Sequence, residues 1–361
     1  MLGELHLHPM CFAAWQVFRL VTAWAAQPQH NRFGFLEIEG VRALMIRIAG
    51  NDLAPADEPR VALLCVLSEM IAATADLQRL ASACMVVTDW ALTVSAVETA
   101  LAYAGAAAEV SGNARFTWVA GMLHRENGRV LQSEGWFQKA HRLAMRSHDW
   151  DVRARSLMSS GRMLLTVGKY REAREYFERA LLVAERFRLE DRRMEAHHHL
   201  FDAAVAMRDF TRVAKHSRIV ASAYGPDHPR YPYFSHDLAV YWADRGDYER
   251  ALGMLSPLLD RHFHEDASVR LLAFGSALRA AAGCGDRRLF DRLLPEFADL
   301  REPAGPSPLV AQALYTAGLG ASMLRRWSDA EELLVPALEA AEHTGQEDTR
   351  SAAEKLLERL P

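Results

Sequence analysis

A motif that recurs along the chain constrains its fold more than any other feature. The stretches that begin at Gly128 and at Gly161 align without a gap: Gly, Arg, Leu, Gly, an aromatic residue and Ala recur in both, 33 residues apart. A fixed period of about 20 to 50 residues is typical of arrays in which each unit buries its apolar face against the next. The sequence therefore predicts one stacked array in preference to separate globular domains.

The copy that begins at Gly161 is the most complete. It places a small residue in a first helix, Gly and then an aromatic residue at a turn, and Ala, an aromatic residue and Ala along a second helix. Six residues fill these places: Gly161, Gly168, Tyr170, Ala173, Phe177 and Ala180. In this pattern the chain resembles the tetratricopeptide repeat family, whose unit is a helix-turn-helix of about 34 residues.

The resemblance covers roughly residues 75–342 and implies an all-α fold, a right-handed superhelical solenoid of antiparallel helix pairs. Later copies are weaker but evenly spaced. The first-helix place recurs after Gly161 in steps of 40, 38, 39 and 40 residues, at Phe201, Ala239, Leu278 and Gly318. Clusters of Pro and Gly predict loops at residues 225–229 and 303–308.

We divide the chain into three parts. Residues 1–59 form an N-terminal helical region that matches no repeat, with helices expected near 10–26 and 36–49 and an acidic turn at 53–59. Residues 60–342 form the predicted repeat array, with the clearest repeats at 121–153, 154–187, 232–262 and 311–342. Residues 343–361 are expected to form a C-terminal capping helix, because arrays need their last open face covered.

Charge and cysteine content narrow the choice of partners. A net charge of -4 and a pI near 6.4 provide no positive field for nucleic acid or an anionic membrane. The apolar stretch at residues 10–26 is too short to span a bilayer. The four cysteines form no CxxC pair, which favours a reducing compartment. We therefore expect a cytoplasmic protein with a protein or peptide partner and no nucleic-acid or membrane partner. Assembly into a homo-oligomer stays open.

No catalytic motif is present: the sequence lacks Gly-x-Ser-x-Gly, the phosphate-binding GxxxxGK[ST], GxGxxG and His-Glu-x-x-His. The consecutive histidines 197–199 point in directions about 100 degrees apart on a helix, so they cannot converge on one metal ion. Only His198 or His199 shares a helix face with Asp202. His262 and His264 lack further ligands in the same way. We expect a non-enzymatic protein with no cofactor and no metal.

The family resemblance implies that ligands bind along the first helices of the pairs, which line the concave side of the solenoid. Nine residues near the small first-helix positions are the candidates for this groove: Arg125, Arg129, Arg155, Arg162, His198, Asp202, Tyr233, His236 and Asp237. The groove would then be basic at one end and acidic at the other. Arg129 and Arg162 follow the two aligned glycines and are expected at equivalent places.

The predicted function is that of a scaffold or adaptor that binds a protein or peptide. Two alternatives remain. One is a peptide-sensing regulator of transcription or signalling, and the other is an enzyme or metalloprotein whose site the sequence does not reveal. The candidate charges could also be ordinary solvated residues of surface helices.

Overall fold

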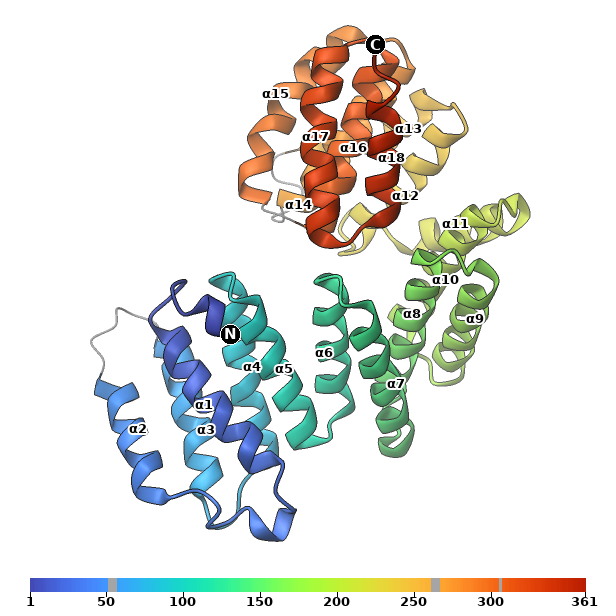
Figure 1. Cartoon of the computed structure of the whole chain (residues 1–361). Helices are drawn as coiled ribbons and strands as arrows, with labels where there is room; N and C mark the ends of the chain where they lie inside the picture. Colours follow the sequence, from blue (N-terminus) through green and yellow to red (C-terminus); the bar gives the residue numbers. More distant parts are fainter. Residues whose placement is uncertain (51–56, 261–266, 305–306) are drawn as a thin grey trace. The chain divides into compact units, whose positions relative to one another are not determined.

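The computed structural model describes residues 1–50, 57–260, 267–304 and 307–361, and these residues form helices and connecting turns without a strand (Figure 1). The predicted all-α class is therefore confirmed. The chain divides into two compact units, Met1–Arg192 and Arg193–Pro361. The α-helices are α1 (Met10–Ala25), α2 (Ile38–Gly50), α3 (Asp57–Ile71), α4 (Leu77–Thr93), α5 (Val97–Ser111), α6 (Ala114–Glu126), α7 (Val130–Ser147), α8 (Trp150–Thr166), α9 (Tyr170–Arg186), α10 (Glu190–Ala206), α11 (Phe210–Ala223), α12 (Tyr231–Asp244), α13 (Tyr248–Leu255), α14 (Ala267–Gly283), α15 (Arg287–Ala304), α16 (Pro308–Met323), α17 (Trp327–Thr344) and α18 (Glu347–Leu357).

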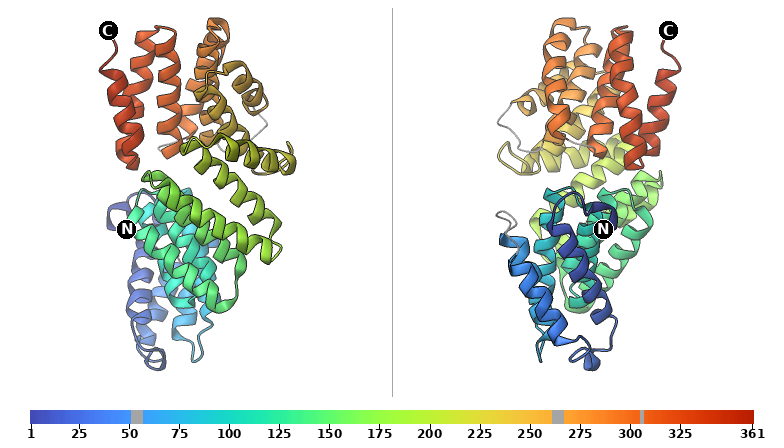
Figure 2. Two further views of the ribbon diagram at one scale, coloured as in Figure 1. Left: turned by 90° about the vertical axis from the view of Figure 1, so that its right-hand side faces the viewer. Right: turned by 60° about the vertical axis from the view of Figure 1, so that its left-hand side comes forward.

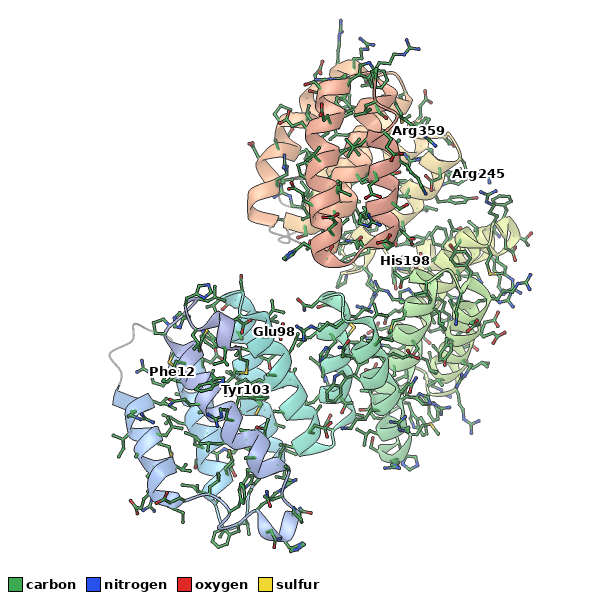
Figure 3. All side chains as sticks on the ribbon, viewed as in Figure 1. Phe12, Glu98, Tyr103, His198, Arg245 and Arg359 are labelled. Atoms are coloured by element: carbon green, nitrogen blue, oxygen red, sulfur yellow. The ribbon has the colours of Figure 1, made fainter. Side chains whose placement is uncertain are left out.

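The first unit begins with an apolar core around α1. This helix packs against α3 and α5, and α2 packs against α3. Trp24 is buried there, and the side chain of Tyr103 on α5 points into the core, where its hydroxyl donates a 2.7 Å hydrogen bond to the Ala14 carbonyl (Figure 3). The Glu4 carboxylate accepts hydrogen bonds from the backbone N–H groups of Glu98 and Thr99, which ties the first residues of the chain to the start of α5.

The structure can be compared with the elements predicted for the N-terminal region, which were two helices and a turn. The helices expected near 10–26 and 36–49 are α1 and α2. Of the turn expected at 53–59, residues 53–56 lie outside the described residues, and residues 57–59 belong to α3 instead. A Pro at the third position of a helix costs no hydrogen bond, because the first N–H groups of a helix have no intrahelical acceptor.

From α4 to α17 successive helices form antiparallel pairs, and we call the first helix of each pair helix A and the second helix B (Figure 2). A residue with positive φ joins A to B in every pair: Ser95, Gly128, Gly168, Arg208, Gly246, Gly285 and Arg325. The next N–H reaches back to a helix A carbonyl, as from Lys169 to Leu164 at 2.9 Å, which satisfies an otherwise unpaired acceptor. These turns recur in steps of 33, 40, 40, 38, 39 and 40 residues.

The equivalence of Gly128 and Gly161 in the sequence alignment is wrong. Gly128 lies in a turn with φ of +70°, whereas Gly161 lies inside α8, where a Cβ atom would come within 2.5 Å of the Phe177 ring. The counterpart of Gly161 is Gly121 of α6, which faces Phe137 in the same way at 2.7 Å. One glycine ends a helix and the other lets two helices approach, and the two roles look identical in a sequence.

The second unit contains the later pairs and α18. α14 and α16 approach so closely that a Cβ atom on Gly275 would lie 2.5 Å from the Ala313 carbonyl oxygen. α18 packs against α16 and α17 and buries Ala353 there. Its position is that of a terminal cap, as expected for residues 343–361, although the division into three parts stays a prediction.

The two predicted loops differ in outcome. Residues 225–229 lie between α11 and α12, as expected. Residues 303 and 304 end α15 and residue 308 starts α16, so the loop predicted at 303–308 is wrong at both ends, and residues 305–306 lie outside the described residues. The proline at 308 begins its helix, where its missing N–H costs nothing. Among the described helices, none combines the length and the hydropathy needed to cross a membrane.

Candidate functional site

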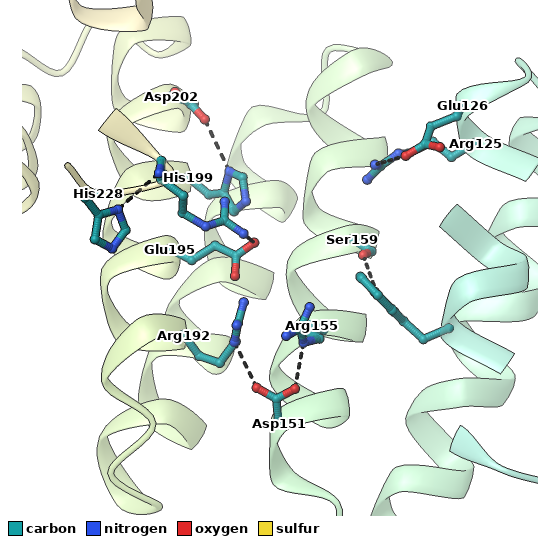
Figure 4. A network of polar contacts seen from close by, with 12 residues as sticks. Arg125, Glu126, Asp151, Arg155, Ser159, Arg192, Glu195, His199, Asp202 and His228 are labelled. Carbon is teal, nitrogen blue, oxygen red and sulfur yellow. Dashed lines mark hydrogen bonds and ion pairs between the residues drawn. The ribbon is translucent and has the colours of Figure 1, made fainter. Parts of the chain in front are cut away.

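An arginine cluster lies on the A helices of the first unit. The Asp151 carboxylate in the first turn of α8 accepts a 2.6 Å hydrogen bond from Arg155 Nε and lies 2.9 Å from Arg192 Nε, at the start of α10 (Figure 4). The Arg155 guanidinium lies 5.0 Å from the ring centroid of Trp118 on α6, and Trp118 Nε1 donates to the Ser159 hydroxyl at 3.1 Å. Arg155 is therefore held between a carboxylate and an aromatic face.

Arg125 of α6 and Arg162 of α8 flank Glu126 further along the same two helices. Arg125 Nη2 lies 3.7 Å from Glu126 Oε1 (Figure 4). Burial raises the pKa of the Glu126 carboxyl, and the positive charges of Arg125 and Arg162 act against that rise. We call Arg125, Arg155, Arg162 and Arg192 the arginine cluster. It contains three of the four arginines predicted for the groove.

Arg129, the fourth predicted arginine, lies elsewhere. It precedes α7 at the turn after α6 and forms an ion pair with Glu98 of α5. Both residues line a hollow of about 630 Å³ whose walls come from α1, α5, α6 and α7 and include the Trp136 ring. Arg162, by contrast, lies inside α8. The two arginines are therefore not equivalent. The gapless alignment paired them because it matched Gly128, which lies in a turn, with Gly161, which lies inside a helix.

In the second unit a buried histidine and a carboxylate join two A helices. His198 of α10 is only 4 % exposed, and its Nε2 lies 2.8 Å from Oδ2 of Asp237 on α12. Burial acts to lower the pKa of His198, but the negative charges of Asp202 and Asp237 outweigh burial and raise it. Burial acts to raise the pKa of Asp237, but hydrogen bonds from His198 and His236 lower it. The surroundings thus favour the charged pair.

His236 extends this network from Asp237 to α14. Its Nδ1 lies 3.3 Å from Asp237 Oδ1, and its Nε2 lies 2.8 Å from the Ser276 hydroxyl oxygen. Serine, histidine and aspartate in this order resemble a hydrolytic triad. However, Ser276 is 5 % exposed in the middle of α14, where the neighbouring backbone N–H groups serve the helix and do not form an oxyanion hole. The network orients Asp237 and does not present a nucleophile.

Asp202 and Tyr233 are the other candidates predicted in this unit. Asp202 Oδ2 lies 3.3 Å from His199 Nδ1 (Figure 4), and Tyr233 is 42 % exposed in the first turn of α12. Ligand atoms of His198, Asp202 and Asp237 all lie within 4.8 Å of one another, which makes them a group that could hold a metal ion. The structure brings these three and His236 together. Their role in binding a partner stays a prediction.

A second histidine pair lies behind this group. Nδ1 of His197 lies 3.1 Å from Nδ1 of His216 on α11, and both side chains are buried. Burial, followed by the charge of His197, lowers the pKa of His216 to about 4. His216 is therefore uncharged near neutral pH, and the pair belongs to the packing between α10 and α11. His262 and His264, considered above as metal ligands, lie outside the described residues.

Several contact partners of the candidates were not predicted. Asp151 could have been found, because it precedes Arg155 by four residues and so shares its helix face. Trp118, Arg192 and Ser276 reach the candidates from other helices. No local pattern in the sequence signals such contacts.

A comparison with protein families identifies the repeats. The family model of the tetratricopeptide repeat matches residues 114–186, which contain the pairs α6/α7 and α8/α9. No curated protein matches the chain.

Several solved structures are similar to the chain at low identity. BtubC (BKLC) from P. vanneervenii is 18 % identical, with a TM-score of 0.45 over 63 % of this chain and 92 % of its own. The Rap conjugation gene regulator of the plasmid pLS20, in complex with the Phr* peptide, is 15 % identical, with a TM-score of 0.47 over 96 % of each chain. A Rap protein complexed with competence and sporulation factor is 12 % identical, with a TM-score of 0.44 over 98 % of this chain and 97 % of its own. The helix pairs of residues 114–186 are therefore tetratricopeptide repeats, and a turn with positive φ joins the two helices of the other described pairs as well.

Proposed function

We propose that this protein is a non-enzymatic adaptor that binds an acidic segment of a protein partner at the arginine cluster. The observation that supports this proposal is the pairing of Arg155 and Arg192 by one carboxylate, that of Asp151, on the A-helix side of the first unit. The cluster contributes four guanidiniums, and the Asp151 carboxylate already lies against two of them. Guanidiniums arranged around a carboxylate favour an acidic ligand.

Arginine suits this role because its planar guanidinium donates two parallel hydrogen bonds to a carboxylate. Asp151 and the Trp118 ring hold Arg155 in place before any ligand arrives, and its side chain is 27 % exposed. Such preorganisation lowers the entropy cost of binding. A contact made by a held and partly buried arginine is worth about 2 kcal/mol or more, whereas an exposed rim charge contributes far less.

Binding is favoured over catalysis by the surroundings of the histidine network. Ser276, which would have to serve as nucleophile, is buried in the middle of a helix. A protein-binding role is also the one that stacked helix pairs of this kind provide, through the surface that successive pairs form together. We further propose a cytoplasmic location, supported by four cysteines that are free thiols. The absence of nucleic-acid binding and the state of assembly stay predictions.

A matched pair of variants tests the proposed site. Arg155→Ala removes a helix A arginine that pairs with Asp151, four residues away in the chain. The control, Arg174→Ala, removes a helix B arginine that pairs in the same way with Glu178, also four residues away. Their side chains are 27 % and 26 % exposed, so the two substitutions disturb the fold to a similar degree.

The two variants and the wild type are compared on an array of random peptides. The wild type and Arg174→Ala should retain peptides rich in Asp and Glu, and Arg155→Ala should bind the same peptides about 30-fold more weakly, which corresponds to about 2 kcal/mol. Equal binding by all three proteins, or retention of neutral peptides only, would show that the arginine cluster is not the binding site.

A further inference from the structure

We propose that the second unit contains a site for one divalent transition-metal ion, of the Zn²⁺ class, formed by His198, Asp202 and Asp237. His198 and Asp202 lie four residues apart on one face of α10, and Asp237 reaches them from α12. The sequence predicted no metal here because α10 alone supplies too few ligands. The third ligand comes from the next A helix, which lies 39 residues further along the chain than His198.

The distances between the three residues suit a single ion. Two ligand atoms that each lie about 2.1 Å from Zn²⁺ in tetrahedral geometry are about 3.4 Å apart. The His198 Nε2 and Asp237 Oδ2 atoms are 2.8 Å apart, and all three ligand atoms lie within 4.8 Å of one another. The Asp202 side chain is 30 % exposed, so a small rotation about its side-chain bonds can close the remaining gap.

The residues around the three ligands already hold them in position. His236 contacts the second oxygen of Asp237 at 3.3 Å and is itself held by the Ser276 hydroxyl at 2.8 Å. The His198 ring meets the edge or face of Phe234 at a centroid distance of 5.2 Å, which restricts its rotation. Outer partners of this kind orient the ligands of metal sites and keep their lone pairs directed at the ion.

Charge and access also suit a divalent cation. Asp202 and Asp237 carry two negative charges, which balance an ion of charge +2 that replaces the proton on His198 Nε2. Their side chains are 30 % and 40 % exposed, so an ion can reach them from solvent. One nitrogen and two carboxylate oxygens, with water as a fourth ligand, form a coordination set that Zn²⁺ accepts.

The test measures Zn²⁺ binding to the full chain, purified without an affinity tag and stripped with a chelator. Titration calorimetry should give one Zn²⁺ per chain, and Co²⁺ in the same site should show the visible absorption of a nitrogen- and oxygen-ligated ion. Asp202→Asn and Asp237→Asn keep the shape of each side chain and should each weaken Zn²⁺ binding by more than about 10-fold. His343→Gln removes an exposed histidine of the same unit and should leave binding unchanged.

Two results would overturn the proposal. One is the absence of stoichiometric Zn²⁺ binding by the wild type, and the other is Zn²⁺ binding by Asp202→Asn with the affinity of the wild type. Circular dichroism of each variant reports whether it is folded. If Asp237→Asn fails to fold, Asp202→Asn decides the question alone, because its partly exposed side chain contributes little to packing.

Discussion

Gly161→Ala is the substitution that most directly tests how the helix pairs are held together. Gly161 lies inside α8, where a Cβ atom would lie 2.5, 2.8 and 2.9 Å from three ring carbons of Phe177 on α9. Contacts this short do not occur for real Cβ atoms, and ordinary contact begins at 3.4 Å. Phe177 is fully buried, so its ring has no open space to move into. The two helices must therefore separate to accept a single methyl group.

The magnitude follows from two opposing effects. Overpacking a buried contact costs about 1 to 3 kcal/mol, and three violated contacts place this case near 3 kcal/mol. Replacing Gly by Ala inside a helix also gains about 1 kcal/mol of helix propensity. The net expectation is a loss of about 2 kcal/mol. Gly135 of α7 is the matched control, because it is exposed, lies inside a helix and has no atom within 4 Å of the place that a methyl group would occupy.

Urea unfolding followed by far-ultraviolet circular dichroism compares the two variants. Gly135→Ala should be about 1 kcal/mol more stable than the wild type, so the two variants should differ by about 3 kcal/mol. In the double variant Gly161→Ala/Phe177→Leu the smaller side chain should relieve part of the clash, so the added methyl should cost less than it does beside Phe177. If Gly161→Ala unfolds at the same urea concentration as Gly135→Ala, the close approach of α8 and α9 is not what requires glycine.

Two further predictions concern buried histidine and the N-terminal segment. Burial and His197 lower the pKa of His216 to about 4 in the folded protein. In the unfolded chain this histidine binds a proton near pH 6.5, so the free energy of unfolding falls as the pH drops from 6.5 toward 4. Between pH 7.5 and pH 5 the wild type should lose about 2 kcal/mol more unfolding free energy than His216→Gln, and equal losses in urea titrations would contradict this assignment. Glu4→Gln removes a negative charge from the start of α5 and should lower the unfolding free energy by about 1 kcal/mol in urea titrations at low salt. Glu332→Gln removes an exposed charge from the interior of α17 and should have no measurable effect in the same titrations.

Much of the fold could be predicted because its signals are local. Helix pairs require an apolar stripe at helical spacing, a turn residue with positive φ and a small residue opposite an aromatic one, and each lies within one repeat. Gly161 and Phe177 are a pair of this kind, and they meet in the structure. The regular steps from Gly161 to Gly318 equal the steps between the turns from Gly168 to Arg325.

The errors occurred where one residue type serves two purposes. Gly128 ends a helix A, whereas Gly161 lies inside a helix A and lets helix B approach closely. The sequences around the two glycines are similar enough to align them with each other. The same misalignment made Arg129 appear equivalent to Arg162. Only the helix bounds show that Arg129 lies in a turn and pairs with Glu98 of an earlier helix.

The class of fold and the repeated helix pair could be identified from the order of the amino acids, and the role of the charged candidates in binding stays a prediction. Which of these charged residues meet depends on how the helices pack. Asp151 holds Arg155 of its own helix and also Arg192, and Asp237 joins His198 because α10 and α12 stand side by side in the second unit. Contacts between helices, such as Gly161 against Phe177 in the first unit, depend on the packing of whole helices, not on any single stretch of sequence.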